Sequence, residues 1–244
     1  MKSHSILCII LLIISILGNV LLLFLLVMSE RSSHPIEQAL DRYGIIKMDE
    51  KHRSDYWICK GWENSISQLN LRFDIAFLGN SLTYGGNFQE YFPGVKICNL
   101  GVSGSTLCDM RWRIPLLKAA KPRKVFIMAG ANDLLVSSID QYIDEYTNLI
   151  TEIRKTLPNI QIYIQTILPM NSDAGPKRIA PDVIIEANDR LSLLSSELKV
   201  TFVDLYTRYN QNDSLPKEFS KDGLHLNREA YSIWAETIYE FIEN

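Results

Sequence analysis

Five short apolar runs, separated by segments of helical periodicity, constrain the fold of this chain more than any other feature of its sequence. Each run is five or six residues long and rich in Ile, Val and Phe, as expected of strands buried on both faces. The runs are Phe73–Leu78, Val95–Leu100, Lys124–Ala129, Gln161–Thr166 and Thr201–Leu205. Strands that alternate with helices predict a parallel sheet, because parallel neighbours need a long crossover connection.

Three of the intervening segments place their apolar side chains on one helical face. They are residues 139–156, 182–198 and 227–242, and Asn227 is positioned to cap the last of them. This alternation predicts a parallel sheet with helices on both faces. Ligands of such sheets bind beyond the carboxyl ends of the strands, so we expect the functional residues there.

The first 28 residues differ in composition from the rest of the chain. They hold 21 hydrophobic residues and one charged side chain, Lys2. The uncharged run Ile6–Met28 has 23 residues, and a helix of that length, about 34 Å, can cross a hydrocarbon core of about 30 Å. We therefore expect residues 1–28 to be a membrane anchor or an uncleaved signal. A cleaved signal peptide and a buried core helix are the alternatives, although the run is long for a signal peptide and lacks a small-x-small cleavage site.

The remaining residues are expected to form two parts. Residues 29–70 read as a linker and a helical lead-in, and residues 71–244 as the globular domain. Lys2 precedes the apolar span, whereas the charges of Glu30 and Arg31 after it cancel, which favours a cytoplasmic N-terminus. The globular domain would then be extracytoplasmic, in a periplasm or at the cell surface, or secreted if the segment is cleaved.

Composition and missing motifs exclude several classes of function. The chain has 25 basic and 28 acidic residues, so it lacks the basic character of nucleic-acid-binding proteins. Cys59, Cys98 and Cys108, an odd number outside the apolar span, do not suggest a disulfide framework, and Cys98 is expected to be a core residue. The sequence contains no G-x-x-x-x-G-K-[ST], G-x-G-x-x-G or G-x-S-x-G motif.

Four polar segments follow predicted strands or precede the last predicted helix. They are GNSLT (79–83), GVSGST (101–106), GANDL (130–134) and DGLHLN (222–227). Taken singly, each could be a turn or a helix cap, with Ser81, Thr106, Asn132 or Asp133 as the capping residue. The predicted fold, however, gathers all four segments on one rim of the sheet.

In this order, the four segments resemble the conserved blocks of the SGNH, or GDSL-type, esterase/lipase family, and the resemblance extends over about residues 73–241. It implies a serine esterase with the SGNH hydrolase fold. That fold is a three-layer α/β/α sandwich around a flavodoxin-like parallel sheet of five strands, in the order 2-1-3-4-5. The implied catalytic triad is Ser81, Asp222 and His225, and the implied oxyanion-hole donors are Ser81, Gly104 and Asn132. One position departs from the family pattern, because Asn80 stands where an Asp is usual. That residue is not the nucleophile, so we expect activity to survive.

The residue types agree with this assignment. A serine hydroxyl needs a base within hydrogen-bond reach, and of the four histidines only His225 lies among the rim segments. Asp222 stands three residues earlier, so one turn can bring its carboxylate to the imidazole. A glycosidase pair of Asp133 and Asp222 would leave Ser81 and His225 unexplained. A single rim histidine and no clustered cysteines argue against a metal site, and no cofactor is expected.

The resemblance does not determine the substrate. Residues 168–181 form a polar segment that contains Lys177 and Arg178 and no long apolar lid. This favours a short acyl group, acetyl foremost, on a polar carrier such as a carbohydrate. The alternatives are a lysophospholipase or lipase-type acylhydrolase, an acyltransferase to a glycan acceptor, and a non-catalytic glycan-binding module. We expect the N-terminal helix to be the only contact with the membrane.

Overall fold

A computed structural model of the chain describes residues 61–243. Within this range the central element is a sheet of five parallel strands in the order β2-β1-β3-β4-β5, as predicted. The strands are β1 (Ile75–Gly79), β2 (Ile97–Gly101), β3 (Lys124–Met128), β4 (Gln161–Gln165) and β5 (Thr201–Val203). β1 and β2 each begin two residues later than the apolar runs suggested, because Asp74 lies at the amino end of the sheet and accepts a hydrogen bond from the Lys96 N–H.

The three predicted long helices are confirmed, with ends that differ by at most one residue from the prediction. They are α8 (Ile139–Thr156), α9 (Pro181–Glu197) and α11 (Arg228–Glu243). The Asn227 side chain accepts a hydrogen bond from the Ala230 N–H at 3.0 Å, which is the predicted cap of α11. The shorter helices are α4 (Ser81–Gly85), α5 (Phe88–Tyr91), α6 (Leu107–Arg111), α7 (Ile114–Ala120) and α10 (Tyr206–Tyr209), together with the 3₁₀ turns η1 (Asp133–Leu135), η2 (Ser172–Lys177) and η3 (Lys217–Phe219).

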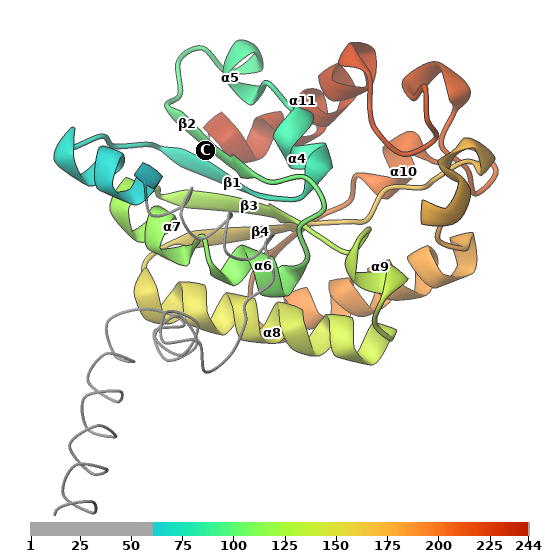
Figure 1. Cartoon of the computed structure of the whole chain (residues 1–244), viewed down its shortest axis with the longest axis horizontal. Coiled ribbons are helices and arrows are strands. Elements are labelled where there is room, and N and C mark those ends of the chain that lie inside the picture. Colours follow the sequence, from blue (N-terminus) through green and yellow to red (C-terminus); the bar gives the residue numbers. More distant parts are fainter. Residues whose placement is uncertain (1–60, 244) are drawn as a thin grey trace, which may run out of the picture. The chain divides into compact units, whose positions relative to one another are not determined.

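Alternate residues of each strand enter two separate cores, one on each face of the sheet. Ala76 and Leu78 pack with the buried side chains of α6, α7, α8 and α9. Ile75 and Phe77 pack with those of α4, α5, α10 and α11. Figure 1 shows these helices below and above the sheet. The three-layer α/β/α prediction is therefore confirmed, because strands buried on both faces need a helical layer on each side.

The predicted anchor, residues 1–28, lies outside the described residues, and so does the linker with most of the lead-in up to residue 60. Of the lead-in, residues 61–68 are helical, with Ile66 buried in the core and Trp62 exposed. No helix within residues 61–243 combines the length and the apolar composition that a membrane span requires. The proposed domain boundaries and the proposed anchor remain predictions.

Candidate active site

The order of the strands places three of the four polar segments side by side. β1 lies between β2 and β3 in the sheet, so the segment that contains Ser81 is flanked by the segments that contain Gly104 and Asn132. The chain runs from β1 outward to β2 and then returns past β1 to β3. This reversal of strand order is the position at which parallel α/β sheets bind their ligands.

A tight turn between β1 and α4 presents Ser81. Ser81 is the first residue of α4, and its neighbour Asn80 caps the helix by accepting a hydrogen bond from the Leu82 N–H at 3.0 Å. A Cβ at Gly79 would overlap the Thr83 side chain, so the turn requires glycine there. The alternative reading of Ser81 as a helix cap is therefore wrong. Asn80 keeps the capping function without a charge, since Asn and Asp cap helices about equally well.

A continuous chain of hydrogen bonds joins Asp222, His225 and Ser81. The Asp222 carboxylate lies 2.6 Å from the imidazole Nδ1 atom of His225, and Nε2 of the same ring lies 3.0 Å from the Ser81 hydroxyl oxygen. An ionised carboxylate can only accept, so Nδ1 carries the proton and Nε2 accepts from the serine hydroxyl. The arrangement holds the serine next to a base in the tautomer that can remove its proton.

The Asp222 carboxylate is held in its ionised form by neighbouring donors. It accepts hydrogen bonds from the backbone N–H groups of His225 and Leu224, at 2.8 and 3.1 Å, and from the Ser220 hydroxyl at 3.2 Å. Partial burial raises the pKa of Asp222, but the hydrogen bonds from the His225 ring and from these backbone groups outweigh burial and hold the pKa well below its usual value. The carboxylate can thus stabilise a positive charge on the imidazole.

The turn that carries Asp222 and His225 is supported by Asn171, which belongs to the polar segment 168–181 but was assigned no role at the site from the sequence. Gly223 has a φ of +77°, and a Cβ there would overlap the Asn171 side chain. The Asn171 N–H donates to the Gly223 carbonyl at 3.1 Å, and its side-chain amide donates to the Leu215 carbonyl at 3.0 Å. Asn171 precedes η2 and is buried. The turn is therefore packed against the loop that contains Asn171. Of these features, the sequence indicated only the positive φ of Gly223, through the Asp-Gly dipeptide.

The segments after β2 and β3 meet at a side-chain to backbone hydrogen bond. Gly104 is exposed and has a φ of +73°, a conformation that favours glycine. The Asn132 side-chain amide donates to the Ser105 carbonyl at 2.9 Å. An amide nitrogen carries two hydrogens, so Asn132 keeps a second one for another acceptor. Thr106 caps α6 in a capping box with Asp109, as one reading of that segment predicted.

Two buried charged residues lie next to these segments, and sequence reasoning assigned neither of them a role at the site. Asp133 is 5% exposed and accepts hydrogen bonds from the Leu107 and Gly130 N–H groups, at 2.8 and 3.1 Å. Burial raises the pKa of Asp133 to about 6, although these hydrogen bonds oppose the shift. Arg113 is 2% exposed and donates to the Ser105 hydroxyl at 2.8 Å. A role for Asp133 could have been inferred from the sequence, because it directly follows Asn132 in a rim segment. No sequence pattern indicated a role for Arg113.

An apolar recess adjoins the Ser81 turn. Its side chains nearly fill it. The recess is lined by Asn80, Leu82, Met128, Ala129, Ala131, Ile167, Leu168, Met170 and Leu224. Two of these residues neighbour Ser81, and Leu224 neighbours His225, so the recess lies beside the hydrogen-bonded chain and has no open space for a long apolar group.

Residues 61–243 contain no group of three or more His, Cys, Asp or Glu side chains that could hold a metal ion. Cys98 is buried in β2, as expected of a core residue, and burial raises the pKa of its thiol to about 12. A thiol of this kind is inert as a metal ligand or nucleophile, because both roles require the thiolate.

Comparison with known proteins agrees with the geometry. The family model described as "GDSL-like Lipase/Acylhydrolase family" matches residues 77–233. No curated protein matches this sequence. A structure described as an acylhydrolase from Bacteroides fragilis is similar with a TM-score of 0.65 and 22% identity, over 75% of this chain and 94% of the other.

Two further solved structures show the same fold. A GDSL-like lipase from Bacteroides thetaiotaomicron has a TM-score of 0.61 and 24% identity, over 69% of this chain and 87% of the other. A catalytic serine-to-alanine mutant of an acetylxylan esterase from Geobacillus stearothermophilus has a TM-score of 0.55 and 22% identity, over 70% of this chain and 94% of the other. At these identities the structures show the fold, whereas the family match covers most of the described chain. The chain therefore belongs to the GDSL-like lipase/acylhydrolase family.

Proposed function

We propose that this chain is a serine carboxylic-ester hydrolase with Ser81 as its nucleophile. The observation that carries the proposal is the chain of hydrogen bonds from the Asp222 carboxylate through the His225 ring to the Ser81 hydroxyl. A serine hydroxyl that donates to a histidine, itself oriented by a carboxylate, is the arrangement that activates serine in acyl transfer. Membership in an acylhydrolase family is consistent with this chemistry.

The reaction would proceed in two steps. His225 removes the proton of the Ser81 hydroxyl while the serine oxygen forms a bond to the ester carbonyl carbon. The carbon–oxygen bond to the alcohol then breaks, and His225 returns the proton to that alcohol. Water, deprotonated by the same histidine, attacks the acyl-enzyme, releases the carboxylic acid and restores the serine. Asp222 stays ionised throughout and stabilises the imidazolium that forms in each step.

The negative charge that develops on the carbonyl oxygen needs hydrogen-bond donors. We assign this role to the backbone N–H groups of Ser81 and Gly104 and to the second amide hydrogen of Asn132. These three residues follow three neighbouring strands, and Asn132 is oriented by the Ser105 carbonyl. Removal of one such donor typically lowers turnover by about 10²–10³-fold.

We propose a short acyl group, acetyl foremost, on a polar carrier such as a carbohydrate. The small apolar recess beside Ser81 supports this size, because its side chains leave little space. The exposed, polar η2 segment with Lys177 and Arg178 supports a polar carrier. One structure of the same fold is an acetylxylan esterase. The same residues could also pass the acyl group to a glycan hydroxyl instead of water, and a lipase-type acylhydrolase would require a longer acyl site than this recess provides.

The direct test is hydrolysis of p-nitrophenyl acetate and p-nitrophenyl octanoate by the full chain and by Ser81→Ala. We expect acetyl to be preferred and Ser81→Ala to lose turnover by about 10⁴-fold or more. Ser232→Ala is the matched control, since that hydroxyl bonds within its own helix, α11. Undiminished turnover in Ser81→Ala would overturn the assignment of the nucleophile. A preference for octanoate would overturn the acyl-length proposal alone.

The two leucines that flank His225 allow a sharper test of acyl length. Leu224 lines the recess, whereas Leu226 packs against the opposite core. Leu224→Ala should raise kcat/KM for butanoate and hexanoate esters relative to acetate, because it lengthens the recess. Leu226→Ala should leave the ratio unchanged. Equal ratios in the two variants would mean that the acyl group binds elsewhere.

We also propose that residues 1–28 tether the enzyme to a membrane, with the catalytic domain on the extracytoplasmic side. The uncharged run Ile6–Met28 supports this placement. Fractionation of cells that express the full chain, followed by protease treatment of intact cells or spheroplasts, tests it. A protected domain or a soluble full-length chain would contradict the proposal.

A further inference from the structure

The oxyanion-hole residues lie on two segments that the sheet does not join directly. Gly104 follows β2 and Asn132 follows β3, and β1 lies between these strands. The ladders that join β1 to β2 and to β3 end with the strands and do not extend into the two segments. Their spacing across the end of β1, where Ser81 lies, depends on contacts between the segments themselves.

The Asp133 carboxylate makes the first of these contacts. One oxygen accepts from the N–H of Leu107, at the start of α6, and the other accepts from the N–H of Gly130, just after β3. Both bonds are buried, and Leu107 stands 26 residues before Asp133 in the sequence. The Asp133 side chain thus joins the segment that follows Gly104 to the segment that contains Asn132.

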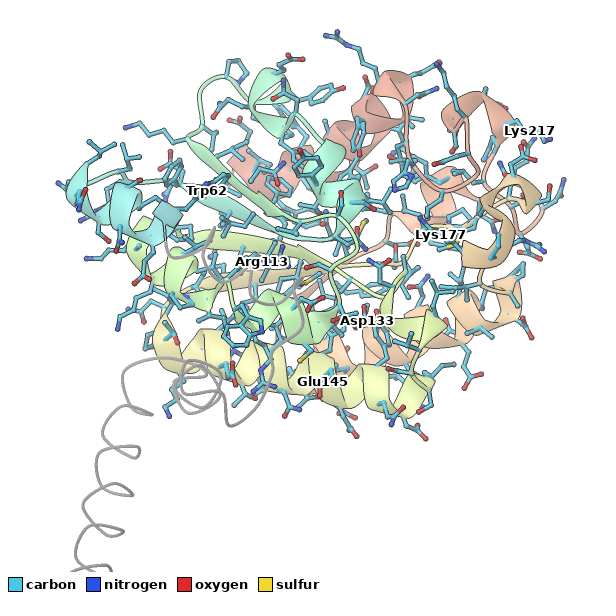
Figure 2. All side chains as sticks on the ribbon, in the orientation of Figure 1. Trp62, Arg113, Asp133, Glu145, Lys177 and Lys217 are labelled. Carbon is cyan, nitrogen blue, oxygen red and sulfur yellow. The ribbon has the colours of Figure 1, made fainter. Side chains whose placement is uncertain are left out.

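Ser105 makes the second contact. Its carbonyl accepts from the Asn132 side-chain amide, and its hydroxyl accepts from the buried Arg113 guanidinium at 2.8 Å. Ser105 itself is 1% exposed. Both charged side chains, Arg113 and Asp133, are labelled in Figure 2. Burying a charged side chain destabilises the fold unless hydrogen bonds or an opposite charge compensate for the lost water. Two such side chains beside the site therefore indicate that they hold neighbouring segments in position.

Resting on the proposed function, we propose that Asp133 is a positioning residue for the oxyanion hole, because its carboxylate ties the segment that carries Gly104 to the segment that carries Asn132. It does not touch the substrate. It sets the separation of two donors that must converge on one oxygen atom in the transition state. Loss of the tie should therefore weaken binding of the transition state and leave binding of the substrate in its ground state nearly unchanged.

Asp133→Asn tests the proposal, since an amide keeps the shape but can accept only through its single oxygen. We expect kcat for acetyl esters to fall by about 10–100-fold, with KM changed less than about threefold, because donors would be misplaced rather than removed. A short trifluoromethyl ketone, whose carbonyl carbon is attacked by Ser81 to form a hemiketal oxyanion, should bind more weakly by the factor that kcat/KM falls. Asp133→Ser, with one acceptor oxygen, is the second variant if the first does not fold.

Thr166→Val is the matched control. Thr166 is also buried, and its hydroxyl oxygen also accepts from two backbone N–H groups, those of Leu205 and Tyr206, at 2.9 and 2.8 Å. These hydrogen bonds join the residue that follows β4 to the segment that follows β5, towards the β5 edge of the sheet. Thr166→Val should lower Tm as Asp133→Asn does, without changing kcat or the affinity for the trifluoromethyl ketone. A loss of Tm without a loss of kcat in Asp133→Asn would show a structural role only and overturn the proposal.

Asn132→Ala separates this inference from the proposed function. If Asn132→Ala keeps full turnover, the oxyanion hole has been assigned wrongly. If Asn132→Ala lowers turnover but Asp133→Asn does not, only the role of Asp133 is wrong. When both variants lower turnover, the double variant should lose less than the product of the two single losses, because Asp133 acts partly through Asn132. A full product would overturn the proposal.

Discussion

The Ser81 hydroxyl lies 3.0 Å from Nε2 of His225, although the two residues are 144 positions apart in the sequence. Ser81 begins the helix that follows β1, whereas His225 stands in a turn that precedes α11. The contact requires the carboxyl end of β1 and the turn before α11 to meet at one rim. Each element that positions one of these two side chains can be tested separately.

Asp222 orients His225, so Asp222→Asn should lower kcat by about 10²–10⁴-fold with little change in the fold. An asparagine can donate to Nδ1 and so favours the tautomer whose Nε2 carries the proton and cannot accept from Ser81. Steady-state kinetics on p-nitrophenyl acetate measures the loss. Asp140→Asn, in an exposed ion pair with Arg190 that joins α8 to α9, is the control and should keep wild-type kcat. Equal rates for the two variants would contradict the role of Asp222.

The lowered pKa of Asp222 has a consequence for pH. A depressed carboxyl pKa means that the contribution of this group to stability is present above its unfolded pKa of about 4 and is lost as the pH falls through the lower folded value. Asp222 is therefore ionised at every pH above about 4. The chemical shift of the Asp222 carboxyl carbon, followed by NMR, should therefore show no titration step between pH 7 and pH 5. A step in that window would contradict the lowered pKa.

Gly223 allows the turn between Asp222 and Leu224, so Gly223→Ala should lower both stability and kcat. The variant has a strained φ and a Cβ that overlaps Asn171. Gly175→Ala is the matched control, since Gly175 also has a positive φ, +57°, but a Cβ there meets nothing within 4 Å. The control should lose about 1–3 kcal/mol of unfolding free energy from backbone strain and keep its kcat. Thermal unfolding and kinetics of both variants measure the difference, and matching losses of kcat would refute the steric argument.

Asn80 caps α4 where the family usually has Asp, and the two replacements Asn80→Asp and Asn80→Ala separate charge from capping. Asn80→Ala should lose about 0.5–2 kcal/mol of unfolding free energy, because the Leu82 N–H loses its acceptor. Asn80→Asp keeps the acceptor and should keep the active-site turn, as measured by kcat on an acetyl ester. Denaturant unfolding gives the free energies. A stable Asn80→Ala variant would show that the cap contributes little here.

Asp133 should make stability depend on pH between about 4 and 6. Its folded pKa of about 6 lies above the ordinary value of 3.8, so its contribution to stability is present below the unfolded pKa and is lost as the pH rises through about 6. Relative to Asp133→Asn, the wild type should lose about 3 kcal/mol between pH 4 and pH 7, since each unit of pKa corresponds to about 1.4 kcal/mol. Urea unfolding at several pH values measures the difference. A constant difference across that range would contradict the shift.

Much of the fold was predictable because the patterns that specify it are local. The apolar runs of Ile, Val and Phe and the helical spacing of residues 139–156 reflect burial that depends on side-chain period alone. The order of strands followed from the family resemblance and from the rule that parallel strands need crossovers. The starts of β1 and β2 were misplaced by two residues, because Asp74 ends the ladder through a side-chain hydrogen bond that no apolar pattern records.

For this protein, the sequence by itself determined the secondary structure, the layers and the identity of the polar residues at the strand ends, including Ser81, Asn132 and His225. Only the tertiary structure decided how these residues meet: the 3.0 Å contact between Ser81 and His225, the cap by Asn80 and the tie made by Asp133. The physical reason is the separation along the sequence over which each effect acts. Periodicity acts within one element, whereas a hydrogen bond between residues far apart in sequence exists only after both elements have packed against the same sheet.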